Sequence, residues 1–381
     1  MPPTTSRFRW TLSGSVPVAR RQLVANPSKL AVSVLAVAAA ITLVLLLSGL
    51  RRGMGDQVTT YLRHEPPVVV GQTGTRNFLS QSSVLTAATV AQIARVRGVA
   101  DASPITEGSS MFPLHGKRVP TVLVGFDPGR RGGPWALRNG RAPRALGEIA
   151  VDRVLAQEHG LRVGTVVPFR GRQLRIVGLT SGTSGFMTPL VFTTRATANE
   201  LNEQPGTATL VLVTPASGVA PAAAVQAVDR SVPGVSARLT SVLASNDRAL
   251  LVGAFSGPLT AMIAIASIVA VMVIAMSVYA EARERSREYA TLKALGMTRR
   301  NVLRLVAVDA SAVAILGLAL GIGFAVAATR LVATLAPKYL IVLTLRDVVA
   351  LAVASSAFAL LGALAPARFL TRLDPATALH S

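Results

Sequence analysis

Residues 30–50 read LAVSVLAVAAAITLVLLLSGL and contain no charged side chain. A helix rises about 1.5 Å per residue, so a run of this length can cross the ~30 Å of hydrocarbon at the centre of a bilayer. Three further uncharged runs lie between Arg248 and Glu281, between Asp309 and Arg330, and between Asp347 and Arg368. The sequence therefore predicts a membrane α-helical protein with four transmembrane helices, at residues 30–50, 255–280, 305–330 and 347–367.

A secretory signal peptide is the alternative interpretation of the first run. Its uncharged core is longer than the ~7–15 residues of a typical signal, and no small-x-small cleavage site clearly follows it. We therefore expect residues 30–50 to stay in place as a membrane anchor. Before this anchor, Val16 to Ala25 fit a short interfacial helix, for which a flexible basic tail is the alternative.

Basic residues gather beside the predicted spans, and the formal net charge of the chain is +21. Residues 1–29 carry five basic and no acidic side chains, and residues 281–304 carry seven basic and three acidic ones. The positive-inside rule places both segments in the cytosol, together with the tail at 368–381. Residues 51–250 and the loop at 331–346 then lie outside, and we expect a cell (inner or plasma) membrane protein whose two termini are cytosolic.

The composition also excludes several classes of function. The chain has no cysteine, its four histidines show no metal-ligand spacing, and no Walker motif for ATP is present. Aromatic residues are sparse, so we interpret the basic surface as solvated or facing anionic lipid and expect no nucleic-acid partner. The spans hold no histidine and no interior pair of acids, which disfavours a membrane enzyme. We expect no catalytic, cofactor-binding or metal site.

Residues 51–250 alternate strand and helix signals, which predicts a large extracytoplasmic α+β domain inserted between the first two spans. Runs rich in branched residues predict strands at 67–72, 121–126, 148–152, 165–169, 173–179, 189–193 and 209–214. Helices are predicted at 86–97, 152–159 and 222–230. Arg170-Gly171-Arg172 fits a hairpin, and the cluster from Ser181 to Gly185 fits a loop, because it lacks the Lys-Ser/Thr ending of a phosphate-binding loop.

The second span is expected to continue as a helix into a cytosolic connector at 281–304, where charged residues fit i,i+3 and i,i+4 pairs. Tyr289, Leu292 and Leu295 then recur at threefold spacing and form an apolar stripe. Gly296 suits the end of this helix, and Thr298 can cap the next one. The stripe predicts a docking surface, for which a solvated helix without a partner is the alternative.

Small residues form two rows within the last two spans. Gly317 and Gly321 are four residues apart in the third span, and Ser355, Ala359 and Ala363 form a similar row in the fourth. Such rows let helices pack closely, and we assign them to a dimer interface. Ordinary tolerance of small residues in an Ala-rich chain is the alternative.

One acidic residue, Asp309, lies near the cytosolic end of the third span. An acid there is costly unless it is paired or reaches the interface. Arg304 is a candidate partner for an intramembrane pair, and extension of the carboxylate to the interface is the alternative.

The run EYATLKALGMTRR at residues 288–300 resembles the signature that precedes the third span in FtsX-like and MacB-type ABC transporter permeases. The resemblance continues through the glycines at 317–323, through Leu373-Asp374-Pro375-Ala376, and through exported segments such as Val124-Gly125-Phe126-Asp127-Pro128. It covers nearly the whole chain, looks closest to DevC-like permeases with a single four-helix core, and implies a MacB-like periplasmic core domain outside the membrane.

This resemblance implies a permease subunit that couples ATP hydrolysis in a separate cytosolic ABC ATPase to motion of the outer domain, for export or efflux. ATP and Mg would be used by that ATPase, and this chain would be neither an enzyme nor a cofactor-binding protein. A second permease copy in a homodimer, an extracytoplasmic adaptor and membrane lipids are the further partners implied. An FtsX-like mechanotransmitting regulator of a cell-wall hydrolase is the alternative without transport.

The family's coupling helix, which seats in a groove of the ATPase, corresponds here to residues 287–296 and the basic residues just after them. The positions carried over are Arg287, Glu288, Tyr289, Thr291, Leu292, Lys293, Leu295, Gly296, Arg299 and Arg300. The apolar members would supply contact area, and the later basic members would meet acidic ATPase residues or lipid phosphates.

Overall fold

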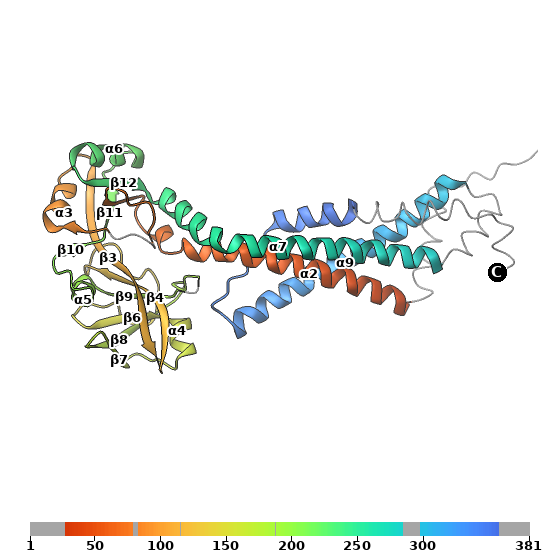
Figure 1. Cartoon of the computed structure of the whole chain (residues 1–381), viewed down its shortest axis with the longest axis horizontal. Coiled ribbons are helices and arrows are strands. Elements are labelled where there is room, and N and C mark those ends of the chain that lie inside the picture. Colours follow the sequence, from red (N-terminus) through yellow and green to blue (C-terminus); the bar gives the residue numbers. More distant parts are fainter. Residues whose placement is uncertain (1–26, 79–82, 115, 187, 285–297, 358–381) are drawn as a thin grey trace, which may run out of the picture. The chain divides into compact units, whose positions relative to one another are not determined.

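The computed structural model describes residues 27–78, 83–114, 116–186, 188–284 and 298–357 of the chain (Figure 1). It divides into two compact units. The helical unit comprises residues 1–50, 257–334 and 341–381, and the sheet unit comprises residues 51–256 and 335–340. The predicted domain at 51–250 and the sheet unit therefore have nearly the same bounds.

Long helices make up the described part of the helical unit. They are α2 (Pro27–Val58), α7 (Thr240–Glu284), α9 (Arg299–Leu335) and a further helix at 345–357. In the described residues, three segments are long and apolar enough to cross a membrane, namely Ala31–Val58, Gly257–Ser277 and Ser311–Leu335. The helix at 345–357 begins where the fourth span is predicted, and the rest of that span lies outside the described residues.

The sheet unit is built on a ten-stranded mixed sheet with the order β12-β1-β11-β3-β4-β9-β6-β8-β5, in which β7 also pairs with β8. Its strands are β1 (Val68–Gln72), β3 (Val99–Leu114), β4 (Lys117–Phe126), β5 (Leu137–Gly140), β6 (Glu148–Asp152), β7 (Val166–Phe169), β8 (Arg172–Thr180), β9 (Leu190–Thr194), β11 (Leu210–Pro215) and β12 (Val235–Leu239). A small second sheet joins β2 (Leu85–Thr86) to β10 (Thr207–Ala208).

Four short helices pack on this sheet, namely α3 (Ala87–Ala94), α4 (Arg153–Glu158), α5 (Arg195–Leu201) and α6 (Pro221–Ser231). A 3-10 turn, η1 (Leu62–His64), links α2 to the sheet. Side chains cap three of the short helices: Thr86, Asp152 and Thr194 each accept a hydrogen bond from a backbone N–H in the first turn. Each of these residues is the last of a strand and directly precedes its helix, so the chain changes from strand to helix at the capping position.

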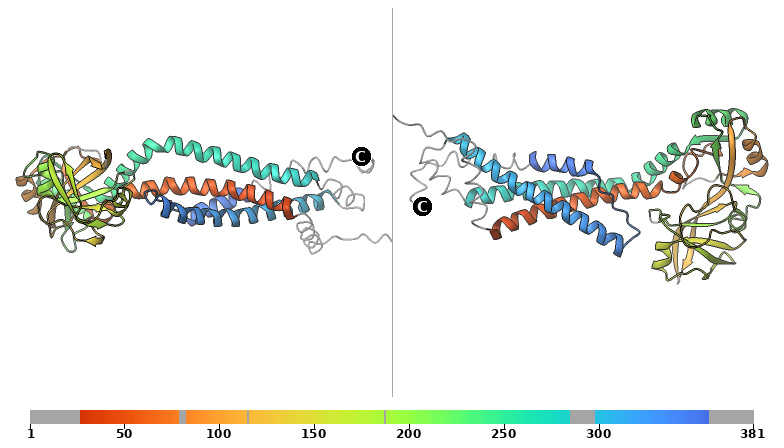
Figure 2. Two further views of the ribbon diagram at one scale, coloured as in Figure 1. Left: turned by 90° about the horizontal axis from the view of Figure 1, so that it is seen from below. Right: turned by 180° about the vertical axis from the view of Figure 1, so that it is seen from behind.

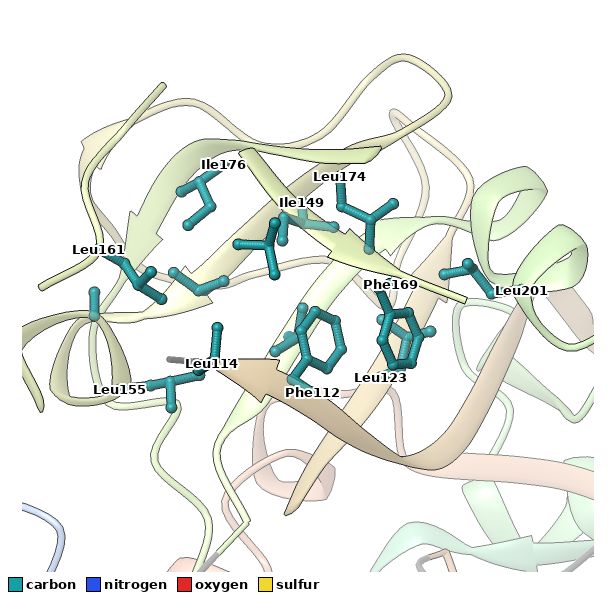
Figure 3. Packing of buried hydrophobic residues seen from close by; sticks show 14 of the residues in the cluster. Phe112, Leu114, Leu123, Ile149, Leu155, Leu161, Phe169, Leu174, Ile176 and Leu201 are labelled. Carbon is teal, nitrogen blue, oxygen red and sulfur yellow. The ribbon is translucent and has the colours of Figure 1, made fainter. Parts of the chain in front are cut away.

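The buried apolar residues form three clusters along the sheet. One lies among β1, β11, β12, α3 and α6, and includes Ile93 and Val228. A second lies at the other end among β3, β4, β6–β9, α4 and α5, where Phe112 stacks on Phe169 with ring centroids 4.4 Å apart (Figure 3). The third lies between them and contains Tyr61 and Phe192. The sheet unit therefore has two lobes with a shared centre.

All seven predicted strands coincide with strands of the structure, namely β1, β4, β6, β7, β8, β9 and β11. The three predicted helices coincide with α3, α4 and α6. The predicted hairpin is confirmed as well, because Phe169 pairs with Arg172. Its two loop residues, Arg170 and Gly171, have φ values of 48° and 76°, as a type I′ turn requires.

The longest strand, β3, is missing from the sequence prediction, because VADASPITEGSSMFPL contains two prolines and several small polar residues. It pairs with β11 through residues 99–105 and with β4 through residues 105–114. Each half therefore has one edge without a strand partner, where the missing N–H of Pro104 or Pro113 is tolerated. The prediction also misses β2, β5, β10, β12 and α5.

Candidate functional site

The candidate site lies in the sheet unit, at two helix ends and one connecting segment, and we call it the helix junction. It consists of the last turns of α2 (residues 51–58), the first turns of α7 (residues 240–256) and the segment 335–340 after α9, all of which belong to the sheet unit. The three helices that lead into the junction, α2, α7 and α9, are those that contain the segments long and apolar enough to cross a membrane.

The ends of α2 and α7 cross closely at Gly55. A Cβ atom added at Gly55 would lie 2.6 Å from Nε of Arg248, so the guanidinium occupies the space that a side chain would need. Arg248 also lies 3.9 Å from the carboxylate of Asp56, which forms a 2.7 Å ion pair with Arg63 after the end of α2. The Asp56 carboxylate of α2 thus lies between Arg248 of α7 and Arg63 of η1.

The start of α7 is held to the sheet by buried hydrogen bonds. Thr240 donates its N–H to the carbonyl of Pro67 at 2.9 Å and its hydroxyl to the carbonyl of Pro66. About two turns further on, the fully buried carboxylate of Asp247 accepts the N–H of Phe78 at 2.9 and 3.1 Å. An unpaired buried polar group costs about 1–3 kcal/mol, so these bonds resist separation of α7 from the sheet.

The end of α2 is fixed by aromatic packing around Tyr61. Its ring stacks on Phe78 at 4.8 Å, and Trp135 and Phe192 pack against it at 6.3 and 6.4 Å. The Tyr61 hydroxyl donates to the carbonyl of Gly132 at 3.1 Å, and burial raises the pKa of Tyr61 well above its usual value. The hydroxyl therefore stays a neutral donor.

Two acidic residues of the sheet unit, outside the junction itself, have raised pKa values. Burial raises the pKa of Glu65 to about 7, against the opposing effect of the Arg131 charge and of a hydrogen bond from the backbone N–H of Gly132. Burial, and then the negative charge of Asp247, raises the pKa of Glu107 on β3 to about 8. Among the described residues, no group of three His, Cys, Asp or Glu side chains is placed to hold a metal ion.

The segment after α9 makes a third attachment. The amide Nε2 of Gln57 donates to the carbonyl of Lys338 at 2.9 Å, and the Lys338 ammonium lies 3.4 Å from Glu158 on α4. Two residues past this segment, in the helical unit, the N–H of Val342 donates to the carbonyl of Gly49 at 3.0 Å. The connection between α9 and the next helix is thus bonded to α2 in both units.

Within the helical unit α9 lies beside α2 (Figure 2), and the glycine row of the third span is at their contact. A Cβ atom at Gly317 would lie 2.5 Å from Val37, and one at Gly321 would lie 2.8 Å from Ile41. The hydroxyl of Thr42, which donates to the carbonyl of Ala38 at 2.7 Å, also lies 3.1 Å from the carbonyl of Gly321. The row thus brings α2 and α9 of one chain together.

The remaining predicted residues are placed only in part. Ser355 is buried in the helix at 345–357 and donates to the carbonyl of Ala352 at 3.1 Å, whereas Ala359 and Ala363 lie outside the described residues. The coupling helix at 287–296 also lies outside them. Its predicted continuation, Arg299 and Arg300, forms the start of α9, after Thr298 at the capping position.

Arg304 and Asp309, the predicted intramembrane pair, both lie on α9. They are five positions apart, which corresponds to roughly 140° around a helix, whereas side-chain neighbours are three or four apart. Their contact stays a prediction. Sequence reasoning did not find Gly55, Gln57 or Arg248, because their partners are far away in the chain. The only signal in the sequence was that Arg248 is a charged residue at the end of an apolar run.

Comparison with known families identifies the protein. Residues 30–231, more than half of the 381-residue chain, match the MacB-like periplasmic core domain, and residues 260–375 match the FtsX-like permease C-terminal domain. The chain belongs to the MacB-type, FtsX-like family of ABC transporter permeases. This confirms the family resemblance seen in the sequence, and a permease of this family is a membrane protein that works with an ATPase subunit.

Relatives of this permease occur in mycobacteria. An uncharacterized ABC transporter permease of Mycobacterium bovis is 28% identical over 292 residues, which cover 75% of this chain and 76% of the relative. Another from Mycobacterium tuberculosis is 26% identical over 294 residues, covering 76% of this chain and 77% of the relative.

Two solved structures are also similar to part of the permease. The periplasmic region of MacB from Actinobacillus actinomycetemcomitans aligns with a TM-score of 0.37 and 12% identity, over 51% of this chain and 94% of that one. The extracellular domain of the noncanonic ABC-type transporter YknZ from Gram-positive bacteria aligns with a TM-score of 0.36 and 10% identity, over 45% and 98%.

Proposed function

We propose that this permease couples ATP hydrolysis by a separate cytosolic ABC ATPase to movement of the sheet unit, and that this movement drives export or efflux. The observation that carries the proposal is the continuity of α2 and α7. Each is a single helix that contains a membrane-length apolar segment. The last turns of α2 and the first turns of α7 belong to the sheet unit, where the contacts of the helix junction hold them. A displacement at the other end of either helix would therefore reach the sheet.

The longest path for such a displacement is α7, which is 45 residues long. It starts directly after β12 and leads toward the cytosolic connector in which the coupling helix is predicted. Pro258 interrupts its hydrogen bonding, since proline has no N–H to offer the carbonyl four residues earlier. We infer that α7 bends near Pro258 and otherwise transmits motion as a rod.

The arrangement we propose has four transmembrane helices, cytosolic termini and a sheet unit outside the cell (inner or plasma) membrane. The chain contributes one set of spans and no ATPase motif, so two permease copies and two ATPase subunits would form the working assembly, with an extracytoplasmic adaptor as a further partner. The excess of basic residues beside the spans supports the orientation.

Purification of the permease from its own membrane tests the coupling. Leu292→Asp or Leu295→Asp would place a charge on the apolar stripe and should abolish co-purification of the ATPase, while membrane insertion is kept. Ala294→Asp is the matched control, because position 294 lies on the opposite face of the predicted helix and should tolerate the charge. Unchanged recovery of the ATPase with both leucine variants would refute the proposed coupling helix.

Transport is tested separately, by ATP-dependent efflux from vesicles that contain the permease and its ATPase. Recovery of an extracytoplasmic cell-wall hydrolase with the complex, without any ATP-dependent efflux, would contradict export and support the FtsX-like regulator instead.

A further inference from the structure

The segment that follows α9 exposes apolar side chains beside a cation. Residues 335–340, Leu-Ala-Pro-Lys-Tyr-Leu, belong to the sheet unit. Leu335, Tyr339 and Leu340 are 75%, 39% and 43% exposed. Leu335 is also the last residue of α9 and of its apolar segment Ser311–Leu335. The exposed apolar side chains therefore directly continue a segment that is long and apolar enough to cross a membrane.

The cation of this segment, Lys338, is held by its backbone more firmly than by its side chain. Its carbonyl accepts the 2.9 Å hydrogen bond from Gln57. Its Nζ lies 3.4 Å from Oε1 of Glu158 on α4, and the two side chains are 49% and 38% exposed. An exposed ion pair of this kind contributes little to stability. The ammonium group can therefore exchange Glu158 for another anion while the segment stays in place.

The surroundings of Lys338 in the sequence favour a lipid phosphate as that anion. From residue 330 to residue 346 the chain has three basic side chains and no acidic one, namely Arg330, Lys338 and Arg346. Tyrosine rings are enriched at the level of the lipid headgroups, and lysine can keep its carbon chain in an apolar region while its charge reaches the phosphates. The Lys338 Nζ already lies 5.6 Å from the centre of the Tyr339 ring.

We propose that residues 335–340 insert into the interface of the bilayer, and that Lys338 there binds the phosphate of an anionic phospholipid in place of Glu158. The three exposed apolar side chains lie among the ends of the acyl chains nearest the headgroups, and the ammonium group donates hydrogen bonds to the phosphate oxygens. The lipid thus competes with α4 for this segment. The inference rests on the proposed crossing of the membrane by α9, and it is independent of ATP hydrolysis.

Nitroxide labels on single cysteines measure this insertion, because the chain has no cysteine of its own. Leu340→Cys places the label on the segment. Val326→Cys, at an exposed position of the apolar part of α9, marks the span, and Ser217→Cys, exposed in the sheet unit, marks water. The full-length permease is reconstituted in phosphatidylcholine, with or without phosphatidylglycerol. The depth of each label is read from its collision rates with O₂, which concentrates in hydrocarbon, and with a nickel chelate, which stays in water.

In the bilayer with phosphatidylglycerol we expect the labels at 326 and 340 to collide mainly with O₂, and the label at 217 to collide mainly with the nickel chelate. Lys338→Gln should lower the ratio of inserted to water-exposed label at 340 about fivefold, since a basic residue near an anionic surface is worth about 1 kcal/mol. Lys338→Arg should retain the ratio. Arg97→Gln, which removes an exposed charge elsewhere in the sheet unit, is the charge-matched control and should leave it unchanged.

The three label positions separate the possible failures. A label at 340 that stays in water while the label at 326 lies in hydrocarbon would overturn this inference alone, as would an unchanged ratio in Lys338→Gln. A label at 326 that lies in water would overturn the span itself, and this inference with it. Inorganic phosphate added to pure phosphatidylcholine should not deepen the label at 340. An effect equal to that of phosphatidylglycerol would overturn the assignment to a lipid.

Discussion

Gly321 of α9 packs so closely on Ala38 of α2 that a Cβ atom at position 321 would lie 2.9 Å from the Ala38 carbonyl oxygen. The neighbouring obstacle is Ile41, a branched side chain whose Cγ2 would lie 2.8 Å away. Neither a helix backbone nor a β-branched side chain can move out of the way without a substantial cost in free energy. The spacing of α2 and α9 is therefore fixed by the absence of a side chain on α9.

The first prediction concerns this contact. Gly321→Leu should destabilise the permease by about 1–3 kcal/mol or more, because overpacking forces the two helices apart. Thermal unfolding of the purified full-length protein would show a lower Tm. Gly323→Leu is the control, since a Cβ atom there meets nothing within 4 Å. Equal Tm values for the two variants would contradict the close packing.

The second prediction concerns the buried Glu107, whose pKa is raised from 4.5 to about 8. Between these values the folded protein keeps a proton that the unfolded chain releases, so its contribution to stability is present below about pH 4.5 and is lost as the pH rises to about 8. Glu107→Gln removes this pH-dependent loss of stability, because glutamine does not ionise. Its Tm should equal that of the natural protein at pH 4.5 and exceed it by several degrees at pH 8, since one pKa unit is worth about 1.4 kcal/mol.

The third prediction has the opposite sign and concerns Glu148. Hydrogen bonds from Arg141, and then from the N–H groups of Arg144 and Ala145, lower the pKa of Glu148 to about 2. The folded state here releases a proton that the unfolded chain keeps, so this contribution is present above pH 4.5 and is lost as the pH falls to about 2.

Glu148→Gln should therefore lower the Tm at pH 7, and the difference from the natural protein should vanish near pH 2. Arg141→Ala should show the same trend in weaker form, because the two backbone donors remain. A larger Tm difference at low pH than at pH 7 would contradict the assignment.

The fourth prediction concerns orientation in the membrane. Because the chain has no cysteine, single cysteines report accessibility without a background signal. Ser217→Cys, exposed in the sheet unit, should react with a membrane-impermeant maleimide added outside intact cells, and Ser286→Cys, in the predicted connector, should react only after permeabilisation. The reverse pattern would overturn the proposed topology.

Local patterns in the sequence predict much of the sheet unit. Branched runs such as Glu148–Asp152 are strands in the structure, and Arg170-Gly171 forms the expected turn. These features depend on neighbouring residues, so a single sequence reveals them. β3 is different, because Pro104 and Pro113 disfavour a strand until the partners on each side are known.

The candidate site depends on contacts that no local pattern encodes. The glycines of α9 indicate a close approach, but only the structure shows that Val37 and Ile41 of α2 are the neighbours. Gly55 and Arg248 are separated by most of the sheet unit in sequence, and no periodicity connects them. The coupling helix, by contrast, is predicted from a family motif in the sequence, and its residues lie outside the part of the chain that the structure describes.

The two lobes of the sheet unit cannot be inherited or exchanged independently. β3 contributes Ala102 to the core of one lobe and Phe112 to the core of the other, and the polypeptide between them is one strand of 16 residues. A chimera that replaced one lobe would have to join two halves of a strand, and a truncation at its middle would leave both cores open. Within this permease, the smallest part that can be transplanted is therefore the whole sheet, together with the helix ends that enter it.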